Sequence, residues 1–203
     1  MLLFALLLLV ILAAVALIGR RRSTGPIEIE LRALWLAPCA LILQLPLVQA
    51  WGGAGWRSLL FLASYSLLFL FCALNWRHVG ARLLMAGFLL NFVVVASNGG
   101  FMPISQEAVT RLHPGTTIAD WPAGTLRQGS KDIILPADQI NLRFLSDAIV
   151  VPPPFPLPTA FSVGDLIILA GFAALFWQAF TASTESSSPG QIVNGDESCG
   201  IAN

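Results

Sequence analysis

The stretch Ser97-Asn98-Gly99-Gly100-Phe101-Met102-Pro103 marks the point where a long apolar segment ends and a polar loop begins. Glycine and asparagine are the usual residues just beyond a helix C-terminus, so this stretch predicts the end of a helix. The uncharged apolar windows before it are typical of membrane-spanning helices. We therefore expect the chain to divide here into a membrane part and an extracytoplasmic loop over residues 98–160.

The composition also indicates a small membrane protein. Of 203 residues, 56% are hydrophobic and 11% are charged, whereas about 25% of the residues in an ordinary globular protein are charged. The net charge is zero and no cluster of Lys and Arg is interleaved with aromatic residues, so nucleic acid is excluded as a partner. Membrane lipids and other membrane subunits are the partners that this composition favours.

The uncharged windows predict an all-α integral membrane protein with about five transmembrane helices and one structured extracytoplasmic loop. The polar residues at the end of the chain, rich in Ser, Gly, Asn and acidic side chains, predict a disordered cytoplasmic tail. The expected segments are a first helix over 1–19, a cytoplasmic connection over 20–32, three helices within 33–97, the loop over 98–160, a fifth helix over 161–180 and the tail over 181–203.

Basic residues and tryptophans predict the orientation of these helices. Arg20-Arg21-Arg22 follow the first window and Arg77 and Arg82 follow the third, and arginine is enriched on the cytoplasmic side of a membrane. We therefore expect a bacterial inner-membrane protein with its N-terminus outside and its C-terminus in the cytoplasm. The tryptophans then form two interfacial belts, with Trp35, Trp76 and Trp177 in one and Trp51 and Trp56 in the other.

The loop contains local signals of secondary structure. Ser105 has the character of an N-cap for a short helix through Leu112, which His113-Pro114-Gly115 would end. The segments Asp132–Leu135 and Ala148–Val151 have the composition of short strands. A connection of this length is too long for a plain linker, so we expect it to fold on the membrane surface.

The turn at Asn98, Gly99 and Gly100 has two interpretations. Adjacent glycines can present backbone amides to an anion such as a lipid phosphate, which makes the motif that continues to Met102 and Pro103 a candidate binding site. The alternative, which we favour, is that Asn98 and the two glycines end the preceding helix.

Two carboxylates are candidate functional groups. Asp165 follows Ser162 and Gly164 at the start of the last apolar window, and the Ser-x-x-Asp spacing predicts a capping box rather than a substrate-facing acid. Asp147 stands among apolar residues, where a carboxylate needs a partner, and Arg143 lies four residues before it. We favour a structural salt bridge between these two, with a functional carboxylate as the alternative.

The sequence provides little for catalysis or metal binding. The two histidines, His78 and His113, are expected on opposite sides of the membrane, which excludes a metal site with several histidines. No P-loop and no nucleophile elbow is present, and no cofactor is implied. The polar residues expected deep in the membrane are predicted to bond between helices, and they are Gln44, Tyr65, Ser66 and Asn91.

Three motifs together resemble a family of uncharacterised bacterial multi-pass membrane proteins, a domain of unknown function. The motifs are Asn98–Pro103, Asn141–Ile149 and Phe161–Asp165, and the resemblance extends over roughly residues 33–180. This chain has Ser146 where the family often has glycine, and it lacks a Lys-His pair near Lys131. The resemblance implies a membrane protein of unassigned function, so it adds architecture and no chemistry.

Two hypotheses about function follow. In the first, which we favour, the protein is a non-catalytic accessory or assembly subunit of a membrane complex, or a lipid-binding scaffold. In the second it is a small enzyme that acts on a lipid or isoprenoid at the outer interface through Asp147, Asp165 and the turn at Asn98. The second hypothesis requires these three elements to converge on one cleft that opens to the bilayer.

Overall fold

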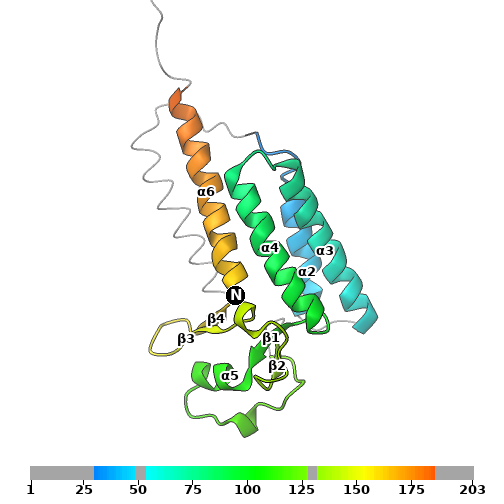
Figure 1. Ribbon diagram of the computed structural model, residues 1–203, viewed down its shortest axis with the longest axis vertical. Coiled ribbons are helices and arrows are strands. Elements are labelled where there is room, and N and C mark those ends of the chain that lie inside the picture. The colour runs from blue at the N-terminus through cyan, green and yellow to red at the C-terminus, as the bar shows by residue number, and fades with distance from the viewer. Residues whose placement is uncertain (1–29, 49–53, 128–131, 186–203) are drawn as a thin grey trace, which may run out of the picture.

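The computed structural model describes residues 30–48, 54–127 and 132–185, and Figure 1 shows a layer of helices with a small α/β unit at one end. The predicted first helix over 1–19, the connection up to residue 29, and residues 51–53 with their tryptophan lie outside the described residues, as does the tail from residue 186. The helices of the layer are α2 (Leu36–Val48), α3 (Ala54–Leu74), α4 (Val79–Ser97) and α6 (Val163–Glu185).

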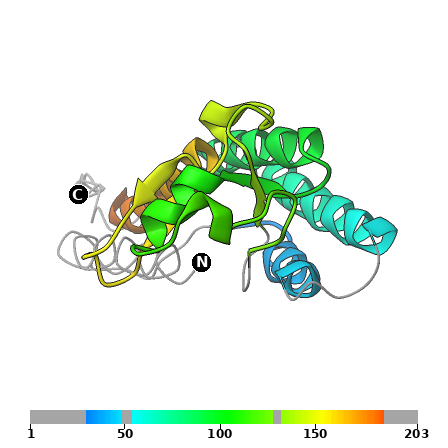
Figure 2. The ribbon, with the colours of Figure 1, turned by 90° about the horizontal axis from the view of Figure 1, so that it is seen from below.

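The described residues between α4 and α6, 99–127 and 132–162, form the unit that we call the loop unit. Its strands β1 and β2 pair in parallel and its strands β3 and β4 pair antiparallel. Seen from the end of the layer, the loop unit lies over the ends of α4 and α6 (Figure 2). Its elements are β1 (Met102–Ser105), α5 (Gln106–Leu112), η1 (Ile118–Asp120), β2 (Asp132–Leu135), η2 (Arg143–Leu145), β3 (Ile149–Val151) and β4 (Thr159–Phe161).

The prediction of a five-span, all-α protein is wrong. The loop unit contains two sheets, and among the described helices α4 alone is long and apolar enough to cross a membrane. The apolar stretches of α3 and α6, Leu59–Leu74 and Val163–Ala179, are shorter, and α2 has 13 residues where a span needs about 20. Helices α3 and α6 themselves have 21 and 23 residues, so it is the apolar part of each helix that is too short, not the helix.

Glycines allow α4 and α6 to pack closely along their length. A Cβ atom added at Gly87 would lie 2.8 Å from the carbonyl oxygen of Gly164, and one added at Gly171 would lie 2.9 Å from the backbone nitrogen of Leu84. A Cβ atom added at Gly80 would lie 2.6 Å from the carbonyl oxygen of Gly171. Small residues that bring two backbones together in this way are typical of helix interfaces in membranes.

Helix α3 contacts α2 through a hydrogen bond and α4 through aromatic side chains. Gln44 of α2 donates to Ser64 of α3 over 3.3 Å, which is a bond between helices of the kind expected for Gln44. Ser66 instead donates to a carbonyl of its own helix, that of Leu62. An aromatic cluster joins α3 to α4 with ring centroids 4.6–5.9 Å apart, and its members are Phe61, Tyr65, Phe69 and Phe92.

Candidate functional site

The turn at Asn98 ends helix α4. The amides of Asn98 and Gly100 both donate to the carbonyl of Val95, over 3.2 and 2.9 Å. Gly99 and Gly100 have φ values of +74° and +89°, a conformation that glycine adopts without steric cost. Because the Gly100 amide is used by the helix, the two glycines do not present a pair of free amides to an anion.

The side chain of Asn98 ties the loop unit to the end of α4. Its Nδ2 donates to the carbonyl of Asn141 and its Oδ1 accepts from the amide of Asn141, each over 3.0 Å. The same Nδ2 donates to the carbonyl of Val94 over 2.8 Å, and Asn141 Nδ2 donates to the carbonyl of Ser97 over 2.8 Å. One amide side chain therefore holds a backbone unit 43 residues away in the sequence.

Asn75 makes the same arrangement at the opposite end of the layer. Its Oδ1 accepts from the amide of Arg32 over 2.8 Å, and its Nδ2 donates to the carbonyls of Arg32 and Phe71 over 2.9 and 2.7 Å. Asn75 directly follows the last residue of α3, as Asn98 follows the last residue of α4. Sequence reasoning missed Asn75, although its position just past a helix end is the signal that it shares with Asn98.

Met102 and Pro103 lie in the protein interior. Met102 is 1% exposed and packs with Val94 and Val95 of α4. Pro103 is also fully buried, and it pairs with Ile133 in the parallel sheet. This half of the motif therefore packs the first strand of the loop unit against α4.

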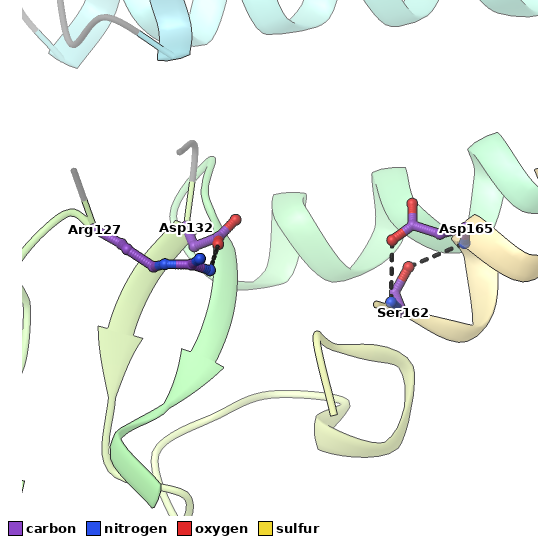
Figure 3. A network of polar contacts seen from close by, with 4 residues as sticks. All are labelled: Arg127, Asp132, Ser162 and Asp165. Carbon is purple, nitrogen blue, oxygen red and sulfur yellow. Dashed lines mark hydrogen bonds and ion pairs between the residues drawn. The ribbon is translucent and has the colours of Figure 1, made fainter. Parts of the chain in front are cut away.

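The Asp165 carboxylate is part of a closed ring of hydrogen bonds at the start of α6. Asp165 Oδ2 accepts from the amide of Ser162, and the Asp165 amide donates to Ser162 Oγ, both over 3.0 Å, which is the predicted capping box (Figure 3). Asn91 of α4 completes the ring: its Nδ2 donates to Asp165 Oδ1 over 2.9 Å, and its Oδ1 accepts from Ser162 Oγ over 3.0 Å. Both carboxylate oxygens therefore accept hydrogen bonds.

Gly164 gives Asn91 room to reach this ring. A Cβ atom at Gly164 would collide with Oδ1 of Asn91, so a larger residue would push the amide out of place. Asn91 is 2% exposed, and a buried amide of this kind must be hydrogen-bonded to avoid a large desolvation cost. The sequence predicts that Asn91 bonds to another helix, but it does not identify the capping box of α6 as the partner.

Arg143 and Asp147 lie in different environments. Asp147 is 8% exposed, whereas the Arg143 side chain is exposed. The helical turn that holds Arg143 ends at Leu145, and Ser146 caps it by bonding to the Arg143 carbonyl through its amide and its Oγ, over 3.2 and 2.6 Å. The continuous helix on which the i, i+4 pairing depends does not extend to Asp147.

An ion pair between Arg127 and Asp132 lies in the loop unit and was missed by sequence reasoning. Arg127 Nη1 lies 3.1 Å from Asp132 Oδ2 (Figure 3). The Arg127 amide also donates to the Asp132 carbonyl over 3.0 Å. The carboxylate side chain is 6% exposed. A basic and an acidic residue five positions apart could have suggested the pair, but only if a chain reversal between them were known.

The two histidines lie in different parts of the structure. His113 lies in the loop unit with its ring centroid 5.0 Å from that of Trp121, and His78 precedes α4 at the opposite end of the layer. Burial, and then the positive charge of Arg127, lower the pKa of His113. Hydrogen bonds from Thr117 lower the pKa of Asp120. Within residues 30–48, 54–127 and 132–185, no three His, Cys, Asp or Glu side chains are grouped so as to hold a metal ion.

The polar groups of the candidate site are arranged to hold elements together. Asn98 joins α4 to the segment at Asn141, and Asp165 joins the start of α6 to Asn91 of α4. Both side chains use their polar atoms in these bonds. These hydrogen bonds fix the position of the loop unit on the helical layer.

Comparison with known proteins gives the family and no activity. No curated protein and no solved structure matches the chain. The part that matches a family begins before α2 and ends within α6, so it includes the helical layer and the whole loop unit. Residues 28–177 match a family of unknown function, DUF5317, and the chain belongs to that family.

Proposed function

We propose that the protein is a membrane-resident, non-catalytic scaffold that holds the loop unit at the outer face of the membrane as an accessory or assembly subunit. The observation that carries this proposal is the use of the motif side chains: Asn98 and Asp165 serve as connectors between elements. Polar atoms already held in such bonds are less available to act on a substrate, whereas a scaffold needs such connectors to fix its geometry.

The apolar surface of the helical layer supports a location in the membrane. A soluble protein rarely exposes a large contiguous apolar patch. Exposed large apolar side chains occur on every helix of the layer, at 42–62% of their full accessibility, and examples are Leu41, Ile42, Leu59, Leu62, Leu89, Val93 and Leu166. Lipid tails would cover this surface at no desolvation cost.

Residues at the end of the layer away from the loop unit support the orientation. Arg32, Arg77 and Arg82 are exposed at the end away from the loop unit. Trp35 and Trp76 are 64% and 54% exposed at that same end. Arginines favour the cytoplasmic side and tryptophans favour the interface, so we propose that this end faces the cytoplasm and that the loop unit lies outside.

Cysteine labelling in intact cells tests the location and the orientation. With the three native cysteines replaced by alanine, Ala123→Cys in the loop unit should react with a membrane-impermeant maleimide, because Ala123 is exposed. Arg77→Cys, exposed at the other end, should react only after the cells are permeabilised. Equal labelling of both positions in intact cells would contradict the proposed orientation.

Native mass spectrometry of the full chain in lipid discs tests the non-catalytic role. We expect the protein to hold a second membrane protein in a fixed stoichiometry, and we expect Asp147→Asn to leave that complex intact. The enzyme hypothesis predicts a lone chain that converts a bound lipid into a product of different mass, and loses that conversion in Asp147→Asn. Detection of such a product would overturn the scaffold proposal.

A further inference from the structure

The turn η2 places an exposed aromatic side chain at the boundary between the loop unit and the helical layer. Phe144 is 70% exposed, the largest fraction among the exposed large hydrophobic side chains of the described residues, and its neighbour Leu142 is 37% exposed. Leu142 adopts a left-handed conformation, with φ 55° and ψ 44°. A bulky residue in this conformation is strained, and such strain persists only where the surroundings impose it.

The surroundings that impose this conformation lie on both sides of the turn. Before it, Asn141 is held by Asn98 and by the Ser97 carbonyl. After it, Leu145 packs against the buried cluster that contains Val94, Val95 and Met102. The turn is therefore fixed to the end of α4 by polar bonds at one side and by apolar packing at the other, and Leu142 and Phe144 remain exposed between these two anchors.

The bonds of Asn141 also set the depth of the turn. Because Asn141 Nδ2 donates to the carbonyl of Ser97, the last residue of α4, the turn begins at the level where that helix ends. Helix α4 is the described helix with the length and composition of a membrane span. If α4 crosses the bilayer as proposed, Leu142 and Phe144 lie at the level of the lipid headgroups.

We propose that Leu142, Arg143 and Phe144 form a lipid-binding turn, in which the two apolar side chains enter the outer leaflet of the same membrane and Arg143 binds a lipid phosphate. The exposed arginine between two exposed apolar residues matches the layered chemistry of that region, where phosphates lie just above the acyl chains. Interfacial anchors built from basic and large apolar side chains follow the same pattern. This inference rests on the proposed membrane location.

Depth-dependent quenching tests this turn in the full chain. A single cysteine at Phe144→Cys, labelled with an environment-sensitive fluorophore, is compared with Leu89→Cys on α4 and Ala123→Cys in the loop unit, in lipid discs of phosphatidylglycerol and phosphatidylcholine. All three side chains are exposed, so none of the substitutions should disturb the fold. We expect position 144 to be quenched strongly by lipids with a nitroxide near the headgroup, and several-fold less by aqueous iodide than position 123.

The three labels separate failure of this inference from failure of the proposed location. If position 89 is quenched by lipid nitroxides and position 144 by iodide alone, the turn faces water and the inference is overturned while the location stands. If positions 89 and 144 are both quenched by iodide alone, the membrane location itself is overturned. Protection of position 144 from both quenchers would mean that a protein covers it, which also overturns the inference.

The role of Arg143 has its own measurement. We expect stronger headgroup quenching at position 144 in discs that contain anionic phosphatidylglycerol than in discs of phosphatidylcholine alone, because the negative surface attracts the Arg143 guanidinium more strongly than a zwitterionic surface does. Arg143→Gln should remove this difference, and Arg111→Gln, which removes an exposed charge from α5, should leave it unchanged. If Arg143→Gln leaves the quenching at position 144 unchanged in both lipid mixtures, the phosphate contact is overturned.

Discussion

Asn91 in the middle of one helix and Asp165 in the first turn of another are joined by a 2.9 Å hydrogen bond from the amide Nδ2 to the carboxylate Oδ1. The carboxylate also accepts from the Ser162 amide, so the same group caps α6 and ties it to α4. A buried polar network in which every member is bonded can stabilise a structure, whereas a partly broken one is costly. Asp165 therefore serves as a structural connector between two helices.

We predict that Asn91 and Asp165 depend on each other for stability. Asn91→Ala and Asp165→Ala should each lower the free energy of unfolding by about 1–3 kcal/mol, because each leaves a buried polar partner unsatisfied. A double-mutant cycle, measured by thermal or detergent unfolding of the purified chain, should give a coupling energy of about 0.5–3 kcal/mol. Additive effects of the two substitutions would contradict the network.

Asn98 is predicted to hold the loop unit in place. Asn98→Ala removes the two reciprocal bonds to Asn141 and the bond to the Val94 carbonyl, which should cost about 1–3 kcal/mol. The loss should appear as faster proteolysis of the loop unit, with the helical layer still intact. Ser66→Ala is the control, because Ser66 is exposed on α3 and its hydroxyl donates to the Leu62 carbonyl of its own helix. Equal proteolysis of both variants would show that the Asn98 side chain does not hold the loop unit in place.

Features that depend on neighbouring residues could be predicted from the sequence. Ser105 caps α5, accepting from the Ala108 amide over 3.1 Å, and α5 ends at Leu112, as the sequence predicts. Strand β2 has the predicted bounds Asp132–Leu135, and β3 lies within the predicted segment 148–151. A cap, a turn and a short strand are each set by a few consecutive residues, so their signals are local.

Features that depend on distant partners could not be predicted. Asn98 and Asn141 are 43 residues apart and Asn91 and Asp165 are 74 apart, and hydrophobic periodicity does not identify the partner of a polar side chain. The predicted fold class, an all-α protein with five spans, was wrong for a related reason. Strands of three or four residues are a weak signal beside long apolar windows, and those windows do not reveal where a helix ends.

Because α4 and α6 approach closely, we predict that stability depends strongly on side-chain size at Gly171 and little at its neighbour Ala170. Gly171 is buried against Leu84, and a side chain there would meet Leu84 atoms at 2.9 Å, whereas its neighbour Ala170 is exposed. Gly171→Val should lower the free energy of unfolding by about 1–3 kcal/mol because overpacking forces the backbones apart. Ala170→Val is the matched control and should change stability little. A similar loss in both variants would indicate that valine itself, rather than helix contact, destabilises α6.

His113 is predicted to make the loop unit less stable in mild acid. Burial, and then the charge of Arg127, hold the pKa of His113 in the folded state below its ordinary value, which is about 6.5. The unfolded chain therefore binds the proton first, so this contribution to stability is fully present above the unfolded pKa and is lost as the pH falls through the lowered folded pKa. NMR titration of the two histidines, assigned with His113→Gln, should give His113 a pKa below the ordinary value. The unfolding midpoint of the wild-type chain should fall between neutral pH and about pH 5, the range in which histidine titrates, and the fall should be smaller in His113→Gln. An equal fall in the variant would mean that another group causes the pH dependence, because glutamine has no charge to gain in that range.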